Sequence, residues 1–311
     1  MRSSKIKSPS HYDKVCDIAV EAIVQMYTNK NEFYKSNLFS YIYDGTLNIL
    51  GTLSSNNHYT DVEILNFIKN HIDIDIDINF NFVKLELSEN LINTNSDTFL
   101  GYCCNENPQG IPFEQLEALT LSKYLYDNFK IPFELEITIN GKEINVIIET
   151  NYLNKKEISD KVEYYITKSE NYLRKTVFTT DFTKKTIHSS SNNFISNFYG
   201  PRSPYGNTNF VGLDIYNNYR YSHLISREIS KKYLNENQLN YCLVELTYHS
   251  DKELPIQMGI KGNDSGIHLE NGTFFIYSDN YDTYNSIKNK VIEYISSNKT
   301  SLIDIAKWGI I

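Results

Sequence analysis

The sequence predicts an α+β fold, because segments with the two-residue period of strands alternate with segments that have the period of amphipathic helices. Residues 71–87 (HIDIDIDINFNFVKLEL) alternate almost strictly between apolar and polar side chains, which is typical of a long strand. Residues 133–149 contain two shorter runs of strand type around Asn140-Gly141, which predicts a hairpin. Residues 10–26 instead repeat apolar side chains every three or four positions. Such a mixture favours sheets covered by helices.

Length and composition set broad limits on the class of protein. The chain has 311 residues, 41% of them hydrophobic, which suffices for two or three domains or one large core. The net charge of −8, without a stripe of Lys and Arg, argues against nucleic acid as a partner. The positive N-terminus is not followed by an apolar segment, and no run of 18 apolar residues occurs, so we expect a cytoplasmic protein that does not insert into membranes.

The cysteines do not indicate a disulfide framework or a zinc site. They form no CxxC pair and have no His partner at zinc spacing. Cys103 and Cys104 have no nearby cation in sequence that would lower the thiol pKa, so we expect them to be small packing residues.

The first third of the chain reads as a helix, a hairpin, a second helix and a strand. The helix at residues 10–26 begins with Ser10 and Asp13 as a capping pair, and Asp44-Gly45 predicts a turn within residues 38–53. Residues 59–68 predict the second helix. The aspartates within the strand at 71–87 lack the glycine of a calcium loop and fit the polar face of a strand better.

Later elements follow the same two periods. The Gly/Asn/Pro-rich loop 101–112 leads into a helix with Pro112 in its first turn. On that helix the apolar side chains share one face, and Glu114 and Glu117 lie on another. The remaining expected elements are a helix at 222–234, a strand within 241–255, a helix at 284–295 and a short tail through Trp308.

Two segments resemble signatures of the methionine adenosyltransferase (S-adenosylmethionine synthetase) family. GYCCNENPQGIP resembles the family's Gly-Tyr-Ala-Thr-(Asn/Asp)-Glu-Thr segment that leads to Met-Pro, and SPSHYDKVCDIA resembles its Ser-Glu-Gly-His-Pro-Asp-Lys-Ile-Ala-Asp segment. Together with three further matches, these two segments follow the order of the family along the chain, and the resemblance covers about nine tenths of it. Fold is the safest inference from such collinear matches. The matching positions in these two segments are Gly101, Tyr102, Asn105, Glu106, Pro112, His11, Asp13, Lys14 and Asp17.

The resemblance implies an S-adenosylmethionine synthetase-like fold of three intertwined sheet-plus-helix domains with pseudo-threefold symmetry. The implied division joins residues 1–9 with 119–199, residues 10–91 with 200–219, and residues 92–118 with 220–311. Proteins of this family pair as dimers with two active sites between the subunits. We therefore expect a homodimer, or a heteromer with a paralogue.

The resemblance also implies roles for individual residues. His11 and Lys14 would face a triphosphate, and Asp13 would hold Mg²⁺; a helix N-terminus attracts phosphate, and a carboxylate suits a hard cation. Lys130 is the only plausible match to the family's catalytic lysine. Without the resemblance, His11 and Lys14 would read as a solvated helix start. The candidate nucleotide contacts are Asn105, Glu106, Phe194, Arg202, Asp214 and Arg220.

The chain departs from the family where methionine and potassium would bind. Thr52 and Ser203 replace acidic residues of the methionine site, Pro108 replaces another, and Phe39 replaces a potassium-binding carboxylate, so K⁺ is doubtful as a cofactor. The segment between Glu89 and Gly101 is shorter than the family's mobile loop. Arg202 and Arg220 could supply part of the missing charge.

Three functions are compatible with these patterns. The first is a divergent adenosyltransferase that takes Mg-ATP and a thioether, methionine or a relative, and releases phosphate and pyrophosphate. The second is a catalytically degenerate nucleotide-binding or regulatory homologue that pairs with an active paralogue. The third, without the resemblance, is an acidic interaction protein.

Overall fold

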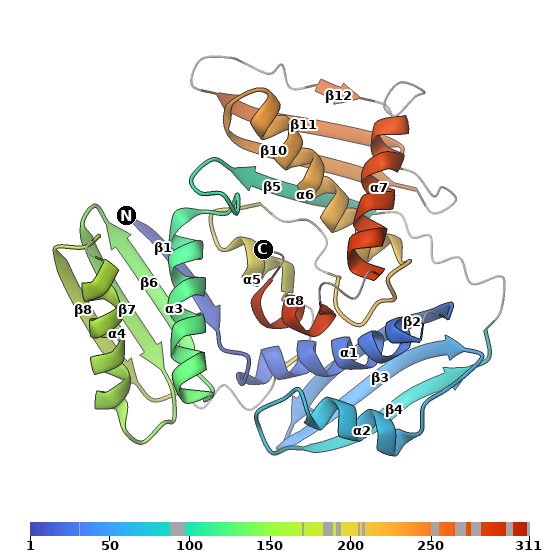
Figure 1. The fold of residues 1–311 in the computed structure, drawn as a ribbon, viewed down its shortest axis with the longest axis horizontal. Helices are drawn as coiled ribbons and strands as arrows, with labels where there is room; N and C mark the ends of the chain where they lie inside the picture. The colour runs from blue at the N-terminus through green and yellow to red at the C-terminus, as the bar shows by residue number, and fades with distance from the viewer. Residues whose placement is uncertain are drawn as a thin grey trace.

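In a computed structural model of the protein, the described residues form three four-stranded sheets with helices packed against them (Figure 1). The expected α+β class is confirmed. Among the described residues, no helix combines the length and apolar character needed to cross a bilayer. The structure describes residues 1–30, 32–87, 97–169, 171–182, 189–190, 194–204, 206, 209–249, 255–264, 272–274, 281–296 and 301–309.

The first sheet joins the start of the chain to residues 134–180. Alternate side chains of its central strands are buried against α3 (Phe113–Phe129) and α4 (Lys155–Ser169), which explains their two-residue period. The hairpin turn consists of Gly141, with φ of 58°, and Lys142, one residue later than expected, because Asn140 still pairs with Glu143. The strands, in spatial order, are β1 (Arg2–Lys7), β6 (Glu134–Asn140), β7 (Glu143–Glu149) and β8 (Arg174–Thr180).

The second sheet packs on α1 (Tyr12–Asn29) and α2 (Asp61–Lys69). Its hairpin turns at Asp44 and Gly45, both with positive φ, as the sequence predicts. The helix α2 connects two parallel strands and starts with a capping box between Thr60 and Glu63. The strands, in spatial order, are β4 (Asp77–Leu85), β3 (Thr46–Ser55), β2 (Tyr34–Tyr43) and β9 (Ser189–Ser190).

The third sheet packs on α6 (Asn218–Glu236), and α6 in turn contacts α7 (Tyr281–Ser296). The backbone of α6 approaches β5 so closely that a Cβ at Gly101 would lie 2.1 Å from the carbonyl carbon of Ser226. A glycine is therefore required at this position. The strands, in spatial order, are β12 (Gly272–Phe274), β11 (Gln257–Asp264), β10 (Leu239–Tyr248) and β5 (Asp97–Cys104).

A structural repeat that the letters of the sequence do not show relates the three sheets. In each repeat a strand precedes a helix and a hairpin: β1, α1 and β2–β3; β5, α3 and β6–β7; β9, α6 and β10–β11. The first strand of each repeat pairs not with its own hairpin but with another one: β1 with β6, β5 with β10, and β9 with β2. This cyclic exchange intertwines the three units. It also places β9 in the second sheet rather than with residues 119–199; the division into domains stays a prediction.

Helix α1 lies at the centre of the molecule, and residues 13–28 are all buried. A helix buried on every side must pair its charged side chains. Glu21 does so with Arg220 of α6, at 2.9 and 2.5 Å, and its Oε1 also accepts a hydrogen bond from Gly212 N at 2.7 Å. The C-terminal residues fold as α8 (Leu302–Trp308) against α1, where Leu302 N donates to Gln25 Oε1. The tail expected there is thus a helix.

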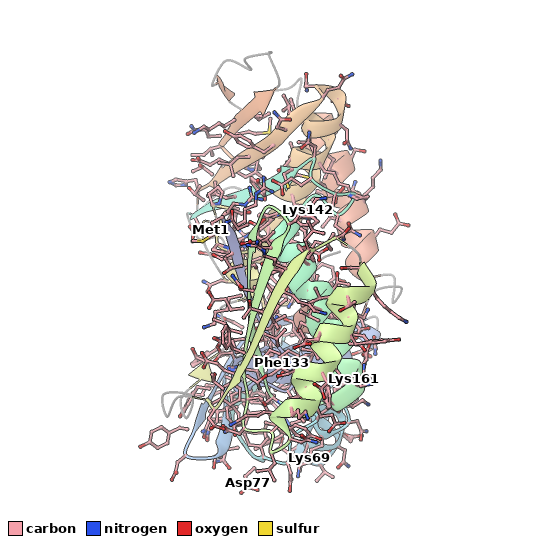
Figure 2. All side chains as sticks on the ribbon, turned by 90° about the vertical axis from the view of Figure 1, so that its left-hand side faces the viewer. Met1, Lys69, Asp77, Phe133, Lys142 and Lys161 are labelled. Carbon is pink, nitrogen blue, oxygen red and sulfur yellow. The ribbon has the colours of Figure 1, made fainter. Side chains whose placement is uncertain are left out.

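In the part of the chain that the structure describes, the helices lie on one side of the sheets and leave the opposite sheet faces uncovered (Figures 1 and 2). On the uncovered face of the second sheet, Phe39, Tyr43 and Val83 are exposed. On the first sheet, the paired residues Ile147 and Phe178 are exposed as well. Contiguous apolar side chains on a sheet face are typical of a surface that another protein covers.

Several element boundaries expected from the sequence are wrong, among them the start of the loop expected at residues 101–112, because β5 continues to Cys104. Helix α1 is capped by His11, whose Nδ1 accepts from Asp13 N at 3.3 Å, while the Ser10 hydroxyl donates to the carbonyl of Lys130 instead. The strand expected at 71–87 begins only at Asp77, because its partner β3 starts opposite it, directly after the hairpin turn.

The sequence also gives no sign of the burial of Glu114. This residue is fully buried although it lies on the polar face of the predicted helix, because the guanidinium of Arg202 pairs with it. The helical period predicts which residues share a face, but not that a distant arginine will cover one of them.

We expect Arg220→Met to lower the free energy of unfolding by about 3–5 kcal/mol, because it leaves the buried Glu21 carboxylate without its counter-charge. Chemical denaturation measures this. The matched control is Arg174→Met, which breaks the exposed pair with Glu143 and should cost less than about 1 kcal/mol. Adding Glu21→Gln to Arg220→Met should recover part of the loss. Equal losses for Arg220→Met and Arg174→Met would contradict this account.

Candidate functional site

The start of α1 is fixed against the segment that joins α3 to β6. Ser8 N donates to Phe133 O at 2.9 Å, Phe133 N donates to Ser8 Oγ at 2.9 Å, and Ser8 Oγ donates to Ile131 O at 3.0 Å. Ser10 Oγ donates to Lys130 O at 3.3 Å. These bonds bring the backbone of Lys130 next to the start of α1, 120 residues away from Ser10 in the sequence.

His11 lies at this place as a buried, neutral imidazole. It is 2% exposed, and its ring meets that of Phe182 edge-on at 5.6 Å. Burial, helped by the nearby Lys7 and Lys5 and opposed by Asp13, lowers the pKa of His11 to about 4. Because Nδ1 accepts from Asp13 N, the proton of the neutral ring sits on Nε2. Nε2 is buried and has no hydrogen-bond partner among the described residues.

Asp13 and Lys7 form an ion pair beside His11. The ammonium of Lys7 donates to Asp13 Oδ2, and both side chains are mostly buried. Lys5, two residues earlier on β1, pairs with Glu134. The amino end of α1 therefore combines the positive end of the helix dipole, a histidine N–H donor, a lysine and a carboxylate. These are the groups that bind a phosphate and its divalent cation.

Lys14 and Lys130 are placed differently from this group. The ammonium of Lys14 is buried and donates to the carbonyl of Ala306, in the last turn of α8, at 2.9 Å. Burial lowers the pKa of Lys14, although Asp17 opposes the shift. Lys130 ends α3 in the left-handed conformation, with φ of 49°, and its side chain is exposed. In this structure the ammonium of Lys14 thus holds α8 against α1.

A second group of candidate residues lies at the other end of α3. Glu106 accepts from Phe113 N at 2.8 Å and so caps that helix. Arg202 binds both Glu106, at 2.8 Å to each oxygen, and the buried Glu114. Burial opposes the charge on Arg202, but the two carboxylates raise its pKa. Burial also acts against charge on Glu106, whereas Arg202 and Phe113 N lower its pKa. Arg202 is therefore neutralised within the protein.

Asp214 and Arg220 are structural in this conformation. Asp214 is buried and accepts from Ser36 N at 3.1 Å and from Tyr216 N at 3.0 Å, which fixes the loop against β2. Burial raises the pKa of Asp214, and the two hydrogen bonds and Arg220 oppose the rise. Arg220 is 0% exposed and bound to Glu21. Phe194 is the first residue of α5 (Phe194–Tyr199), and its side chain lies outside the described part of the structure.

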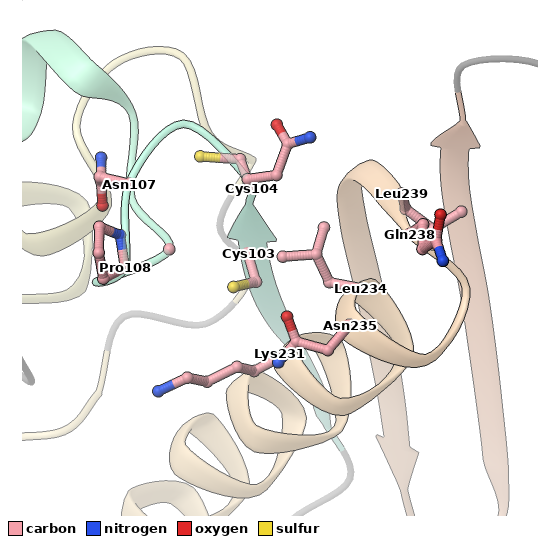
Figure 3. A pocket seen from close by; sticks show the side chains of 11 residues that line it. Cys103, Cys104, Asn107, Pro108, Lys231, Leu234, Asn235, Gln238 and Leu239 are labelled. Carbon is pink, nitrogen blue, oxygen red and sulfur yellow. The ribbon is translucent and has the colours of Figure 1, made fainter.

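A cavity of about 540 Å³ opens beside the loop of the first family-like segment (Figure 3). Asn105 lines it, and the Asn105 amide and side chain both bond to Asn240. Cys103 and Cys104 also line it; both are free and buried, as expected, and burial raises both thiol pKa values. A thiol with a raised pKa is a poor nucleophile and metal ligand. Within the described residues, no three His, Cys, Asp or Glu side chains converge as metal ligands would.

Sequence reasoning missed several residues that build this region. Lys7 and Phe182 contact the candidate residues His11 and Asp13 from other elements, and nothing in their local sequence marks them. Glu21 and Glu114 hold the two arginines that the sequence assigns to nucleotide binding. No local pattern in the sequence marks either glutamate as the partner of an arginine so far along the chain.

Comparison with solved structures shows the fold. The chain is similar to the structure of an unusual S-adenosylmethionine synthetase from Campylobacter jejuni, with a TM-score of 0.77 and 15% sequence identity; the match covers 99% of this chain and 94% of that chain. No protein-family model matches the sequence, and no curated protein matches it either. The protein therefore has an S-adenosylmethionine synthetase-like α+β fold.

We expect the buried His11 to make stability fall as the pH falls from about 6.5 to about 4. In that window the unfolded chain binds a proton at His11 and the folded protein does not, so the free energy of unfolding decreases, by about 2–3 kcal/mol over the window. Denaturation curves at several pH values should show a smaller slope for His11→Gln than for the parent. The slope from His223, whose pKa burial lowers to about 3, remains in both. Identical slopes would contradict the assignment.

Proposed function

We propose that the protein binds Mg-ATP at the amino end of α1 and transfers its adenosyl group to the sulfur of a thioether. The observation that supports this most strongly is His11 Nε2, a buried N–H donor without an acceptor among the described residues. Leaving such a donor unsatisfied is costly, and a phosphate oxygen would satisfy it. The fold, shared with a protein described as an S-adenosylmethionine synthetase, supports the choice of reaction.

The residues present fit the charge of the substrate. Mg²⁺ keeps several waters and takes one or two carboxylates besides the phosphate oxygens, so Asp13 suffices as a protein ligand for a cation that arrives with the nucleotide. Binding of the cation at Asp13 would free Lys7, the present partner of that carboxylate, for a phosphate oxygen.

The reaction needs alignment and charge stabilisation more than acid–base chemistry. The sulfur lone pair attacks C5′ of the ribose, the C5′–O bond breaks, and triphosphate leaves; water then cleaves it to phosphate and pyrophosphate. His11 and Lys7 would bind the oxygen atoms on which charge develops, and the positive end of the α1 dipole would stabilise them. Each such contact lowers the activation free energy of the transfer by on the order of 3 kcal/mol.

A specific observation favours a second candidate, a homologue that binds nucleotide without turning it over. Arg202 and Arg220, the two arginines expected to add positive charge, are held by Glu106, Glu114 and Glu21. Triphosphate release depends on such charges. A nucleotide-binding protein that regulates an active partner needs the α1 site but not the transfer step.

Asp13→Asn should weaken the binding of Mg-ATP by about tenfold or more, because it removes the charge that would hold the cation. Isothermal titration calorimetry measures this. The matched control is Asp61→Asn, which also removes a carboxylate paired with a lysine, but far from α1 in the chain and at the surface. Unchanged affinity in Asp13→Asn would remove the basis for placing the nucleotide here.

Methionine should bind far more weakly than Mg-ATP. Its ammonium and carboxylate need charged partners once water is excluded, and burying them alone costs several kcal/mol. The positions that are acidic in the resembling family hold Thr52, Pro108 and Ser203, and the Ser203 hydroxyl donates to Tyr199 O. We therefore expect an acceptor with a different polar end. Micromolar methionine affinity with ready formation of S-adenosylmethionine would restore the simple synthetase assignment and refute this prediction.

The protein should be a homodimer that buries the uncovered sheet faces. Phe39, Tyr43 and Val83 expose apolar surface there. Light scattering at micromolar concentration should give twice the monomer mass, and Phe39→Lys should shift the protein toward monomer. Leu153→Lys, which changes an exposed apolar residue outside the sheets, is the control and should not. A monomeric parent protein would show that this face is not a self-association surface.

A further inference from the structure

A second cavity, of about 630 Å³, lies between α6, α7 and the loop at Gln109. It shares no residue with the group at the amino end of α1. It meets the cavity of Figure 3 at Pro108 and Lys231, which line both. Its volume is within the range of sites that hold small organic ligands.

The cavity is strongly basic. Arg227, Lys231, Lys232 and Lys290 line it, against one carboxylate, Glu228. The chain as a whole carries a net charge of −8, so this concentration of cations is a local feature. Among the described residues no carboxylate lies within 4.0 Å of the ammonium groups of Lys231 or Lys290, and Lys232 meets Glu236 only at 3.9 Å. A concave surface with one sign of charge attracts ligands of the opposite sign.

Arg227 is a fixed cation within this cavity. It is 4% exposed, and its guanidinium donates to two backbone carbonyls, Tyr102 O at 3.1 Å and Gln109 O at 2.6 Å. Its Cζ lies 4.8 Å from the centre of the Phe198 ring. These neighbours orient the guanidinium but are uncharged, so they do not neutralise it. Burying a charge without a counter-charge is costly, and an anion in the cavity would offset that cost.

Gln109 supplies an independent indication of a ligand. Its side-chain Oε1 is buried and has no hydrogen-bond partner among the described residues, although the residue lines the cavity. Rotation of the amide exchanges oxygen and NH₂, so the same group can present a donor to an anion. A buried carbonyl oxygen left without a donor costs free energy, and the exchanged amide would avoid this cost by donating to a bound anion.

The remaining wall of the cavity is apolar. Leu224 and Val291 are buried, Ile287 is half-buried, and all three come from the facing surfaces of α6 and α7. Inorganic phosphate alone would leave the accessible part of this wall in contact with water. A ligand with an apolar body would cover it, at a gain of about 25 cal/mol per Å².

We propose that this cavity binds a small phosphate monoester with an apolar body, its phosphate on Arg227, Lys231 and Lys290 and its body against Leu224, Ile287 and Val291. Arginine and lysine together suit a phosphate dianion, which accepts several charge-assisted hydrogen bonds. The site is separate from the proposed nucleotide site, and its occupancy does not require Mg²⁺.

Calorimetric titration with octyl phosphate tests the proposal on the full chain. Octyl phosphate should bind saturably at one site, and inorganic phosphate and octanoate should each bind at least about tenfold more weakly, the first for want of an apolar body and the second for want of charge. Binding of octyl phosphate should weaken as salt is added. No saturable binding, or equal affinity for octanoate, would overturn the proposal.

Variants locate the binding. Lys231→Gln with Lys290→Gln should weaken octyl phosphate binding by about tenfold or more while Mg-ATP binding stays as in the parent. The control, Lys155→Gln with Lys161→Gln, changes two lysines of α4 and should have no effect. If the control weakens binding as much, or if the cavity variant leaves it unchanged, octyl phosphate binds elsewhere. If the cavity variant loses Mg-ATP instead, the cavity is a nucleotide site and the proposal is wrong.

Discussion

The pairing of β1 with β6 is the interaction on which the candidate site depends. Because β1 leaves its own repeat and joins the sheet of the next, the chain emerges from Lys7 beside the start of β6, and Ser8 exchanges hydrogen bonds with Phe133. Helix α1 begins there. His11 and Asp13 are therefore held by two sheets at once, which is the kind of rigid support that a binding site needs.

The buried middle part of α1 keeps the start of the helix in place. Every face of the helix is buried, so Glu21 must have a cation, and Arg220 supplies one from α6. The same requirement removes Arg220 from the residues available to a ligand. Arg202 has a comparable position at the other end of α3, where Glu106 and Glu114 hold it. Arg202 and Arg220 thus form ion pairs within the protein, whereas a transferase would use such charges to bind its substrate. This is the physical basis of the second candidate function, a homologue that binds nucleotide without turning it over.

The sequence predicted the features that depend on interactions between neighbouring residues. Helix caps and hairpin turns depend on a few neighbouring residues, so Asp44-Gly45 and the start of α1 were found to within two residues. Long-range pairing is not visible in the letters. Residues 71–76 alternate like a strand but have no partner strand among the described residues. Lys7, in β1, pairs with Asp13, and Phe182, which follows β8, packs on His11. The burial of Glu114 needed Arg202, 88 residues away.

A crystal structure of the protein with Mg²⁺ and a non-hydrolysable ATP analogue would test the nucleotide site at the amino end of α1 directly. We expect a phosphate oxygen within about 3 Å of His11 Nε2, with Asp13 on the cation and Lys7 turned from Asp13 toward the phosphates. An analogue bound at saturating concentration in any other place, with His11 Nε2 still unpartnered and the Lys7–Asp13 pair intact, would contradict the assignment of the amino end of α1 as the nucleotide site.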